Sequence, residues 1–313
     1  MHLLIPFASA LSDASTHVLH DLHLPNLARL LAHLTPAEAD AGNEYTLSPP
    51  HERALAAAWG WDGDDGAWPF AAWAASNDGV VVGEQAWGLV TPAHWLVGRD
   101  HVTLADPEAL QLTEAESRAA FEAVRELFES EGFTLVWGAP SRWYVAHESL
   151  AGLPCAALDR VIGRNVDLWI RHGAAYQSQA RLVRRLQSEV QLLLYPHALN
   201  EEREQRDALT LNSFWLSGCG RAQAVPTTEV VVNDTLRAPL LAQDWVAWAD
   251  AWHALDGGAL ATLLADARAG RSVRLTLCGE RSAQAFDNTA RSLWQQVGSR
   301  FKSPAAHTTL EAL

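Results

Sequence analysis

The sequence predicts an α/β fold, with a mostly parallel sheet, helices on both faces of that sheet, and a small inserted α+β domain. The chain of 313 residues is 49% hydrophobic and 19% charged, which is the composition of a globular protein with a large core. Helical periodicities alternate with β-branched apolar runs near both ends of the chain. Residues 80–169 form a strand-helix-strand pattern that closes on itself, so we expect a core of residues 1–79 and 170–313 with 80–169 as the insert.

The core is expected to begin with a buried strand at His2–Phe7. Helical recurrence of leucine and valine follows over His17–Leu34 and is interrupted at Pro25. A polar, turn-rich stretch leads to a short alanine-rich helix at Glu52–Trp59, which Gly60 ends. The first part of the core is therefore a strand followed by helices.

The insert contains the clearest helix of the chain. Thr113 and Glu116 form a capping box, and the apolar residues that follow at helical spacing end at Gly132. Strands are expected on both sides of this helix, at Val80–Val82, Gly88–Val90, His101–Leu104, Phe133–Trp137 and Trp143–Ala146.

The second part of the core again mixes helices and strands. Arg181–Leu194 is an amphipathic helix, and Asn200–Asp207 is expected to be a charged loop. Ser213–Leu216 should be a buried strand that ends in a glycine-rich turn, with Phe214 and Leu216 on the opposite face from Trp215. Further core strands are expected at Val230–Val232 and Val273–Leu277.

Charge and cysteine content exclude several classes of partner. The formal net charge of −14 argues against a nucleic-acid surface, and no basic helix is present for a membrane surface. No apolar run approaches the roughly 20 residues of a membrane-spanning helix. Cys155, Cys219 and Cys278 are widely spaced with no C-x-x-C pair, so we expect reduced thiols and a cytoplasmic protein without a bound cofactor.

Four segments carry motifs of a known family, in the order of that family. They are Leu24–Leu30 (LPNLARL), His51–Asp62 (HERALAAAWGWD), Asn212–Gly220 (NSFWLSGCG) and Leu275–Ser282 (LTLCGERS). They resemble the archaeal-type cofactor-independent phosphoglycerate mutases of the alkaline phosphatase superfamily. The whole chain is most similar to the degenerate, RpfE-type proteins of proteobacteria. This resemblance implies an alkaline phosphatase-like core with an inserted domain.

The resemblance also implies a phosphoryl-transfer site that this chain does not reproduce. Members of that superfamily use a serine or threonine nucleophile and two divalent metals held by carboxylates and histidines. The resemblance places His51 at the nucleophile position and Glu52 beside it, although Ser48 could act as the nucleophile if the loop shifted. Glu280 and Arg281 replace an aspartate-histidine ligand pair. An arginine cannot be deprotonated, so we expect no metal here. Arg281 is instead expected to pair with Glu52 across a vestigial site.

Other residues are candidates for substrate binding. The resemblance places Arg99 near a phosphate-binding arginine, and it places Asn212, Trp215, Gly218 and Gly220 in the most specific motif. A surface ion pair for Arg99 and a simple turn for the two glycines are the alternatives. His17, His20 and His23 could meet along one helix edge as metal ligands, although a solvated face is the plainer interpretation.

Two functions follow. The first is a phosphoglycerate mutase-like protein without the metal-binding and nucleophilic residues, acting as a regulatory or binding protein for a small anionic ligand or a protein partner. The alternative is an active metal-dependent phosphomutase or phosphatase with a rearranged site built from several histidines together with Glu52, Asp62, Asp64, Asp65 and Glu280. A structural partner subunit cannot be separated from the first function by sequence.

Overall fold

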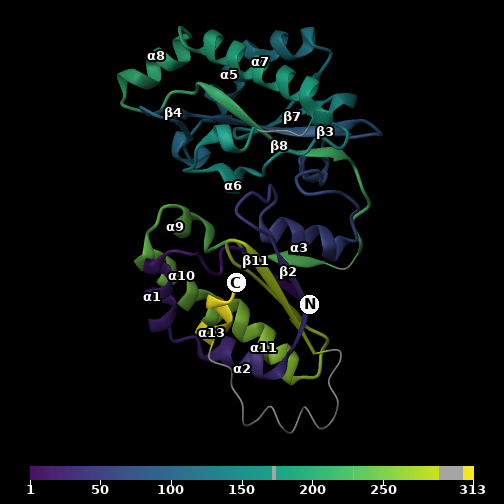
Figure 1. Ribbon diagram of the computed structural model, residues 1–313, viewed down its shortest axis with the longest axis vertical. Coiled ribbons are helices and arrows are strands. Elements are labelled where there is room, and N and C mark those ends of the chain that lie inside the picture. Colours follow the sequence, from purple (N-terminus) through teal and green to yellow (C-terminus); the bar gives the residue numbers. More distant parts are fainter. Residues whose placement is uncertain (171–173, 228, 289–305) are drawn as a thin grey trace. The chain divides into compact units, whose positions relative to one another are not determined.

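The computed structural model describes residues 1–170, 174–227, 229–288 and 306–313 (Figure 1). The chain forms two compact units. Unit 1 contains Met1–Glu44, Pro49–Gly60 and Val225–Leu313, and unit 2 contains Tyr45–Ser48 and Trp61–Ala224. Each unit has its own sheet and its own apolar core.

The sheet of unit 1 is mixed. Its five strands, in spatial order, are β2 (Thr35–Ala41), β11 (Ser282–Asp287), β10 (Arg274–Cys278), β1 (His2–Ile5) and β9 (Val230–Val232). Strand β1 pairs in parallel with β9 and β10, whereas β11 is antiparallel to both β10 and β2. The α/β class is confirmed, but the expectation of a mostly parallel sheet is wrong. Only a short turn joins β10 to β11, and a tight hairpin makes its strands antiparallel.

Helices cover both faces of this sheet. Leu3 and Ile5 of β1 pack into a core formed with helices on one face. The helical segments of that core are α1 (Asp13–Asp21), α2 (Pro25–His33), α9 (Arg237–Leu241), α10 (Trp245–Leu255), the π-helical turn η5 (Asp256–Leu260), α11 (Ala261–Arg268) and α13 (Ala306–Glu311). His2 and Thr276 face α3 (Pro50–Trp59) on the other side, because successive side chains of a strand point to opposite faces.

The sheet of unit 2 is antiparallel throughout. Its order is β6 (Thr134–Ala139), β7 (Arg142–Ala146), β3 (Ala86–Ala93) and β8 (Ser213–Arg221). A separate hairpin is formed by β4 (Trp95–Val97) and β5 (Val102–Leu104). The predicted strand at Val80–Val82 is loop, although Val80 and Val82 still pack against the core.

Helices lie on both faces of this second sheet as well. In Figure 1, α5 (Glu114–Ser130), α7 (Gln177–Leu194) and α8 (Ala198–Gln205) lie over one face. Alanines of α4 (Phe70–Asn77) pack against Trp87 and Tyr144 on the other. The remaining elements are α6 (Leu158–Val161) and the 3-10 turns η1 (Pro107–Leu110), η2 (Glu148–Leu150), η3 (Val166–Leu168) and η4 (Ala174–Tyr176). The capping box of Thr113 and Glu116 is confirmed.

Unit 2 is larger than the predicted insert of residues 80–169. It extends to Ala224 because β8 pairs with β3 along almost its whole length, and because residues of α7 join the core that α5 forms with the sheet. The predicted charged loop at Asn200–Asp207 is mostly the helix α8. It is held by Arg203, which is 1% exposed and donates hydrogen bonds to backbone carbonyls outside the helix.

No helix in the described part of the chain is long and apolar enough to span a membrane.

Candidate functional site

The carboxyl edge of β1 and β10 is the place where ligands usually bind in an α/β sheet. Phe7, just past β1, has a positive φ of 58°, a conformation that is uncommon for a bulky residue. Ala8 N donates a 2.8 Å hydrogen bond to Cys278 O. Glu280 accepts a 3.0 Å hydrogen bond from Leu11 N through Oε2. The Glu280 carboxylate is therefore bound to the loop that follows β1.

This edge is filled by the chain itself. Ser282 N donates a 3.1 Å hydrogen bond to Leu313 O, so the last described segment is tied to the start of β11. A Cβ atom on Gly279 would lie 2.7 Å from Leu313 Cβ, and Ser9 Oγ would be closer still. Only glycine fits at this position, and Leu313 is itself buried at 6% exposure.

Arg281 does not pair with Glu52. Its Nη2 lies 3.7 Å from Glu44 Oε2, and both side chains are largely exposed, at 43% and 57%. The Arg281 backbone is more firmly held, because its carbonyl accepts hydrogen bonds from Gly42 N and from Arg53 Nη2, each at 2.8 Å. Arg53 is also paired with Asp40. Of these two arginines, Arg53 is the more buried, with a side chain that is 10% exposed against 43% for Arg281.

His51 and Glu52 lie in the first turn of α3. The His51 ring packs against the Phe7 ring with centroids 5.3 Å apart. Within the described ranges, no group of three histidine, cysteine, aspartate or glutamate side chains is arranged to hold a metal ion. His20, one of the three histidines considered as ligands, instead faces the His307 ring at 5.6 Å.

A small cavity of about 80 Å³ lies beneath α3 in unit 1. Its charges are already paired, since Arg53 binds Asp40 and Arg274 binds Glu38. His2 donates to or accepts from Thr276 at 2.8 Å, and burial lowers the pKa of His2 to about 4. Both arginines of this cavity are thus paired with carboxylates, although Arg274 Nε has no hydrogen-bond partner.

The two glycines of the NSFWLSGCG motif have structural roles. Both lie within β8, where a turn was predicted. A Cβ atom on Gly218, whose φ is +62°, would lie 2.8 Å from Ala71 N, and one on Gly220 would lie 3.1 Å from Pro69 Cβ. Strand β8 therefore lies directly against the start of α4, and the glycines allow that approach.

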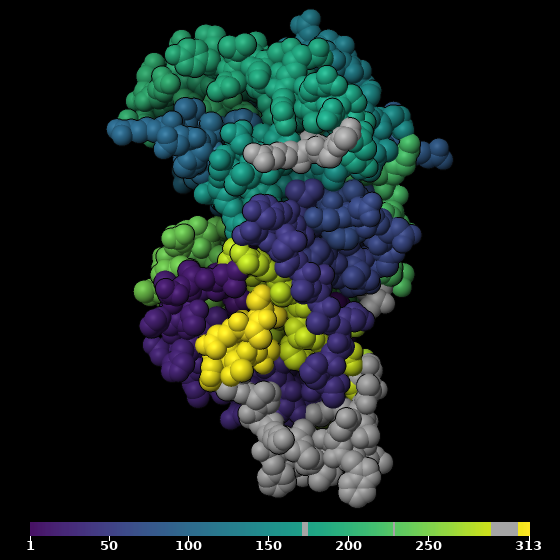
Figure 2. All heavy atoms as spheres, viewed as in Figure 1, coloured from purple at the N-terminus to yellow at the C-terminus, as the bar shows by residue number. Residues whose placement is uncertain are grey.

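Arg99 lies between β4 and β5. Figure 2 shows blue atoms of unit 2, the colour of this part of the chain, standing out from the surface at the upper left. The Arg99 side chain is exposed, and in the described part of the chain it has no ion-pair partner. The surface ion pair considered for Arg99 does not form among the described residues, and the phosphate-binding role stays a prediction.

Asn212 and Trp215, the remaining candidates from the NSFWLSGCG motif, lie in unit 2. Asn212 holds the Trp95 backbone at both ends, accepting from Trp95 N at 2.7 Å and donating to Trp95 O at 3.1 Å. Trp215 Nε1 donates a 2.8 Å hydrogen bond to Ala156 O. The predicted alternation in this strand is confirmed, because Phe214 and Leu216 join one core cluster and Trp215 another.

A cavity of about 490 Å³ opens beside Trp95. It is lined by Trp95, Asp167, Ile170, Arg184, Gln187, Ser188 and Gln191. The side chains at its rim are exposed, including Arg184 and Asp167, whereas Gln187 is buried at 6% exposure. This is a polar hollow with one positive and one negative group.

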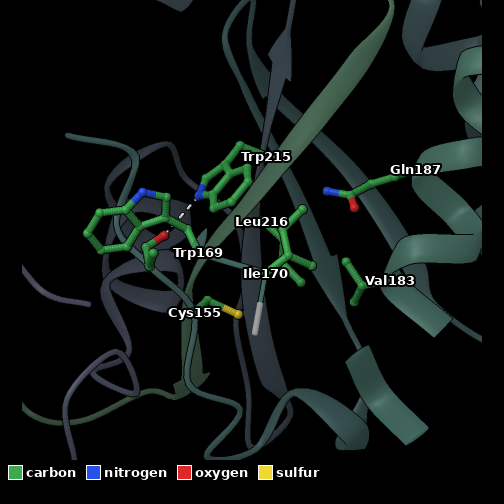
Figure 3. Close-up of a pocket in the computed structure, with 8 residues that line it drawn as sticks. Cys155, Trp169, Ile170, Val183, Gln187, Trp215 and Leu216 are labelled. Atoms are coloured by element: carbon green, nitrogen blue, oxygen red, sulfur yellow. Dashed lines mark hydrogen bonds between the residues drawn. The ribbon is translucent and has the colours of Figure 1, made fainter. Parts of the chain in front are cut away.

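A smaller, more apolar pocket of about 20 Å³ shares Ile170 and Gln187 with this cavity (Figure 3). Figure 3 shows Gln187 reaching from its helix toward Leu216, with Cys155 and Trp169 on the far side. Cys155 Sγ lies 3.7 Å from Cys219 Sγ, and the contact with Cys155 together with burial raises the pKa of the Cys219 thiol. A raised pKa keeps this thiol neutral and unreactive.

Sequence reasoning selected Asn212 and Trp215 but missed Arg184, Asp167 and Trp95. One signal was available in α7. Gln187 follows Val183 by four positions and occupies the buried stripe of an otherwise apolar helix face. A polar side chain in such a stripe needs a partner, and Gln187 Nε2 donates to Phe214 O at 3.2 Å.

No protein-family model matches this chain, and no curated protein matches it in sequence. Among solved structures, it is similar to a cofactor-independent phosphoglycerate mutase from Thermoplasma acidophilum, with 13% identity, a TM-score of 0.38, and coverage of 100% of this chain and 98% of that one. It is also similar to the PH0037 protein from Pyrococcus horikoshii, with 12% identity, a TM-score of 0.48, and coverage of 95% and 92%. TM-scores this low assign neither a site nor a function to this chain.

Proposed function

We propose that this protein binds a small molecule in the cavity of unit 2 and does not transform it. The observation that carries the proposal is the cavity of about 490 Å³ beside Trp95, which is lined by charged and amide side chains. Cavities of roughly 300–1,000 Å³ with a few convergent polar groups are typical ligand sites.

The carboxyl edge of the unit 1 sheet supports the non-catalytic part of this proposal. Leu313 and Ser9 pack against Gly279, and Glu280 is hydrogen-bonded to Leu11 N. This packing at the edge where the sequence resemblance would place a phosphoryl group and its metal ions supports a protein that does not transfer phosphoryl groups. Together with the sequence motifs, this packing favours a phosphoglycerate mutase-like protein of the RpfE type whose regulatory role depends on ligand binding in the cytoplasm.

The first test separates binding from catalysis. The purified protein is incubated with 2-phosphoglycerate and Mn²⁺, and both 3-phosphoglycerate formation and metal content are measured. We expect neither turnover nor stoichiometric Mn²⁺. Turnover with bound metal would overturn the proposal and favour the phosphomutase alternative.

The second test addresses the cavity. Thermal shift with a library of metabolites is compared between the native protein and Ser188→Trp, which places a large side chain at the exposed rim of the cavity. Ser178→Trp, at an exposed position near the start of the same helix and outside the cavity lining, is the matched control. Compounds that stabilise the native protein and Ser178→Trp should fail to stabilise Ser188→Trp. A library without any such compound would contradict the proposed function.

A further inference from the structure

We infer that the cavity of unit 2 takes a zwitterionic ligand, a free α-amino acid or a close relative, with its carboxylate toward Arg184 and its ammonium toward Asp167. This inference rests on the proposed function, since it names the ligand class of that site. It follows from the arrangement of charge in the cavity.

Arg184 and Asp167 line the same cavity without pairing with each other. Within the described ranges neither side chain has an ion-pair partner. The Arg184 guanidinium is nevertheless held in place, because Nη2 donates a 3.0 Å hydrogen bond to Ile170 O. Its remaining N–H groups form a planar donor set suited to a carboxylate. Two opposite charges that share a cavity but not an ion pair favour a ligand that carries both charges.

The other polar side chains of the cavity are neutral. Gln187, Ser188 and Gln191 follow one another along one side of α7 and can donate to or accept from a ligand without adding charge. A ligand with a large net charge, such as a bisphosphate, would be attracted by one of the two charged side chains and repelled by the other, so it would gain little binding free energy. A net-neutral ligand fits this lining better.

The Trp95 indole supplies a second reason. Its Nε1 is shielded from water and has no hydrogen-bond acceptor. Leaving a buried donor unsatisfied costs free energy, and Asn212 holds the Trp95 backbone while the ring remains free of polar contacts. A bound carboxylate near the ring would give this N–H an acceptor after a small shift of the side chain. Binding should therefore change tryptophan fluorescence.

The apolar part of the ligand has a place as well. Ile170 lies in the wall between the cavity and the smaller pocket, which contains Trp169 and Leu216. The smaller pocket is too tight for a whole side chain, but it makes this wall apolar. We therefore expect amino acids with aliphatic or aromatic side chains to bind better than those with a second charge.

The test uses two series of compounds that differ only in charge. The first is L-leucine, 4-methylpentanoate and 3-methylbutylamine, and the second is L-phenylalanine, 3-phenylpropanoate and 2-phenylethylamine. Affinity is measured by calorimetry and by tryptophan fluorescence on the full chain. We expect at least one amino acid to bind at least ten times more tightly than either of the two other compounds in its series, each of which lacks one of the two charges.

Two variants assign the charges. Arg184→Met should reduce the affinity for the amino acid at least tenfold while leaving the affinity for the amine unchanged. Asp167→Asn should also reduce the affinity for the amino acid at least tenfold, but it should leave the affinity for the carboxylate compound unchanged. Arg185→Met is the control, because Arg185 is the next residue on α7 and binds Glu131 instead. Equal affinity across a series, or an Arg184→Met variant that binds as the native protein does, would overturn the inference.

The inference and the proposed function fail in different ways. If only compounds of another class bind, and Ser188→Trp abolishes their binding, the function stands and the zwitterionic ligand is wrong. If no compound binds at the cavity, both are wrong.

Discussion

Asp256 caps helix α2 through Leu27, a residue 229 positions away in the chain. Asp256 Oδ1 accepts a 2.8 Å hydrogen bond from Leu27 N, and Oδ2 accepts a 3.1 Å hydrogen bond from Asn26 N. The residue at the N-cap of α2 is Leu24, whose side chain cannot accept a hydrogen bond. A carboxylate from η5 thus satisfies the free backbone donors of another helix, and it does so at 4% exposure.

Asp256→Ala should therefore destabilise the protein. The change leaves two backbone N–H groups of α2 without an acceptor, which we expect to cost about 2 kcal/mol of unfolding free energy. Urea unfolding monitored by tryptophan fluorescence gives this value. Asp250→Ala, at an exposed position of α10, is the control and should change stability by less than about 0.5 kcal/mol. Equal stability of the two variants would contradict the capping role.

Stability should also depend on pH through Glu116. Burial raises the pKa of Glu116, but hydrogen bonds from Thr113 and Arg203 outweigh it and lower the pKa from 4.5 to about 2. A depressed pKa stabilises the folded state above the unfolded pKa, and this stabilisation is lost as pH falls through the folded pKa. The native protein should exceed Glu116→Gln in stability at pH 7, and the difference should shrink between about pH 5 and pH 2.

The measurement for Glu116 is chemical unfolding of both proteins across that pH range. Glu114→Gln serves as the control, because Glu114 lies in the same first turn of α5 and is 63% exposed. Its difference from the native protein should be small at every pH. A pH-independent gap between native protein and Glu116→Gln would contradict the assignment.

Gly218→Ala and Gly163→Ala should differ in severity. Both glycines have a left-handed φ, of +62° and +73°, so alanine costs about 1 kcal/mol at either position. Gly163 has open space around it, whereas a Cβ atom on Gly218 would lie 2.8 Å from Ala71 N. We expect a total loss of at least about 3 kcal/mol for Gly218→Ala. Thermal unfolding of both variants separates the cost of backbone strain from that of the steric clash. Similar losses of stability in the two variants would show that α4 shifts to make room for the added Cβ atom.

The two arginines near residue 281 should contribute unequally. Arg281→Ala removes an exposed pair with Glu44 at 3.7 Å, so the change in unfolding free energy should be below about 0.5 kcal/mol. Arg53→Ala removes a side chain that is 10% exposed and that binds both Asp40 and the Arg281 carbonyl, and it should cost about 2 kcal/mol. A larger loss for Arg281→Ala than for Arg53→Ala would contradict the exposed placement of the Arg281 side chain.

Local signals in the sequence were sufficient for many elements. The capping box at Thr113, the break at Pro25 and the left-handed residue Gly60 mark helix ends, and each acts within a few residues of its own position. The alternation of Phe214 and Trp215 across a buried strand was also predicted correctly, because period-two burial is a local property.

Pairing between distant segments could not be predicted in the same way. Nothing in the sequence of β8 indicates that it pairs with β3 rather than with β1. Because of this ambiguity, β8 was predicted in the wrong sheet and the boundary of the insert was misplaced. Asp256 and Arg203 act on segments far away in the chain, so neither was recognised. The cavity was missed because its charged residues come from η3 and α7 and meet only in the folded unit.

The strand order of unit 1 determines when β1 can pair with both of its neighbouring strands during synthesis. Strand β1 leaves the ribosome before its parallel partners β9 and β10, which end at Val232 and Cys278. Unit 2, which ends at Ala224, has all of its strands before then. At roughly 5–20 residues per second, the stretch from Ala224 to Cys278 takes roughly 3–10 seconds to make. During that interval the apolar β1 lacks its partner β10, and a chaperone that protects β1 would act at this stage of translation.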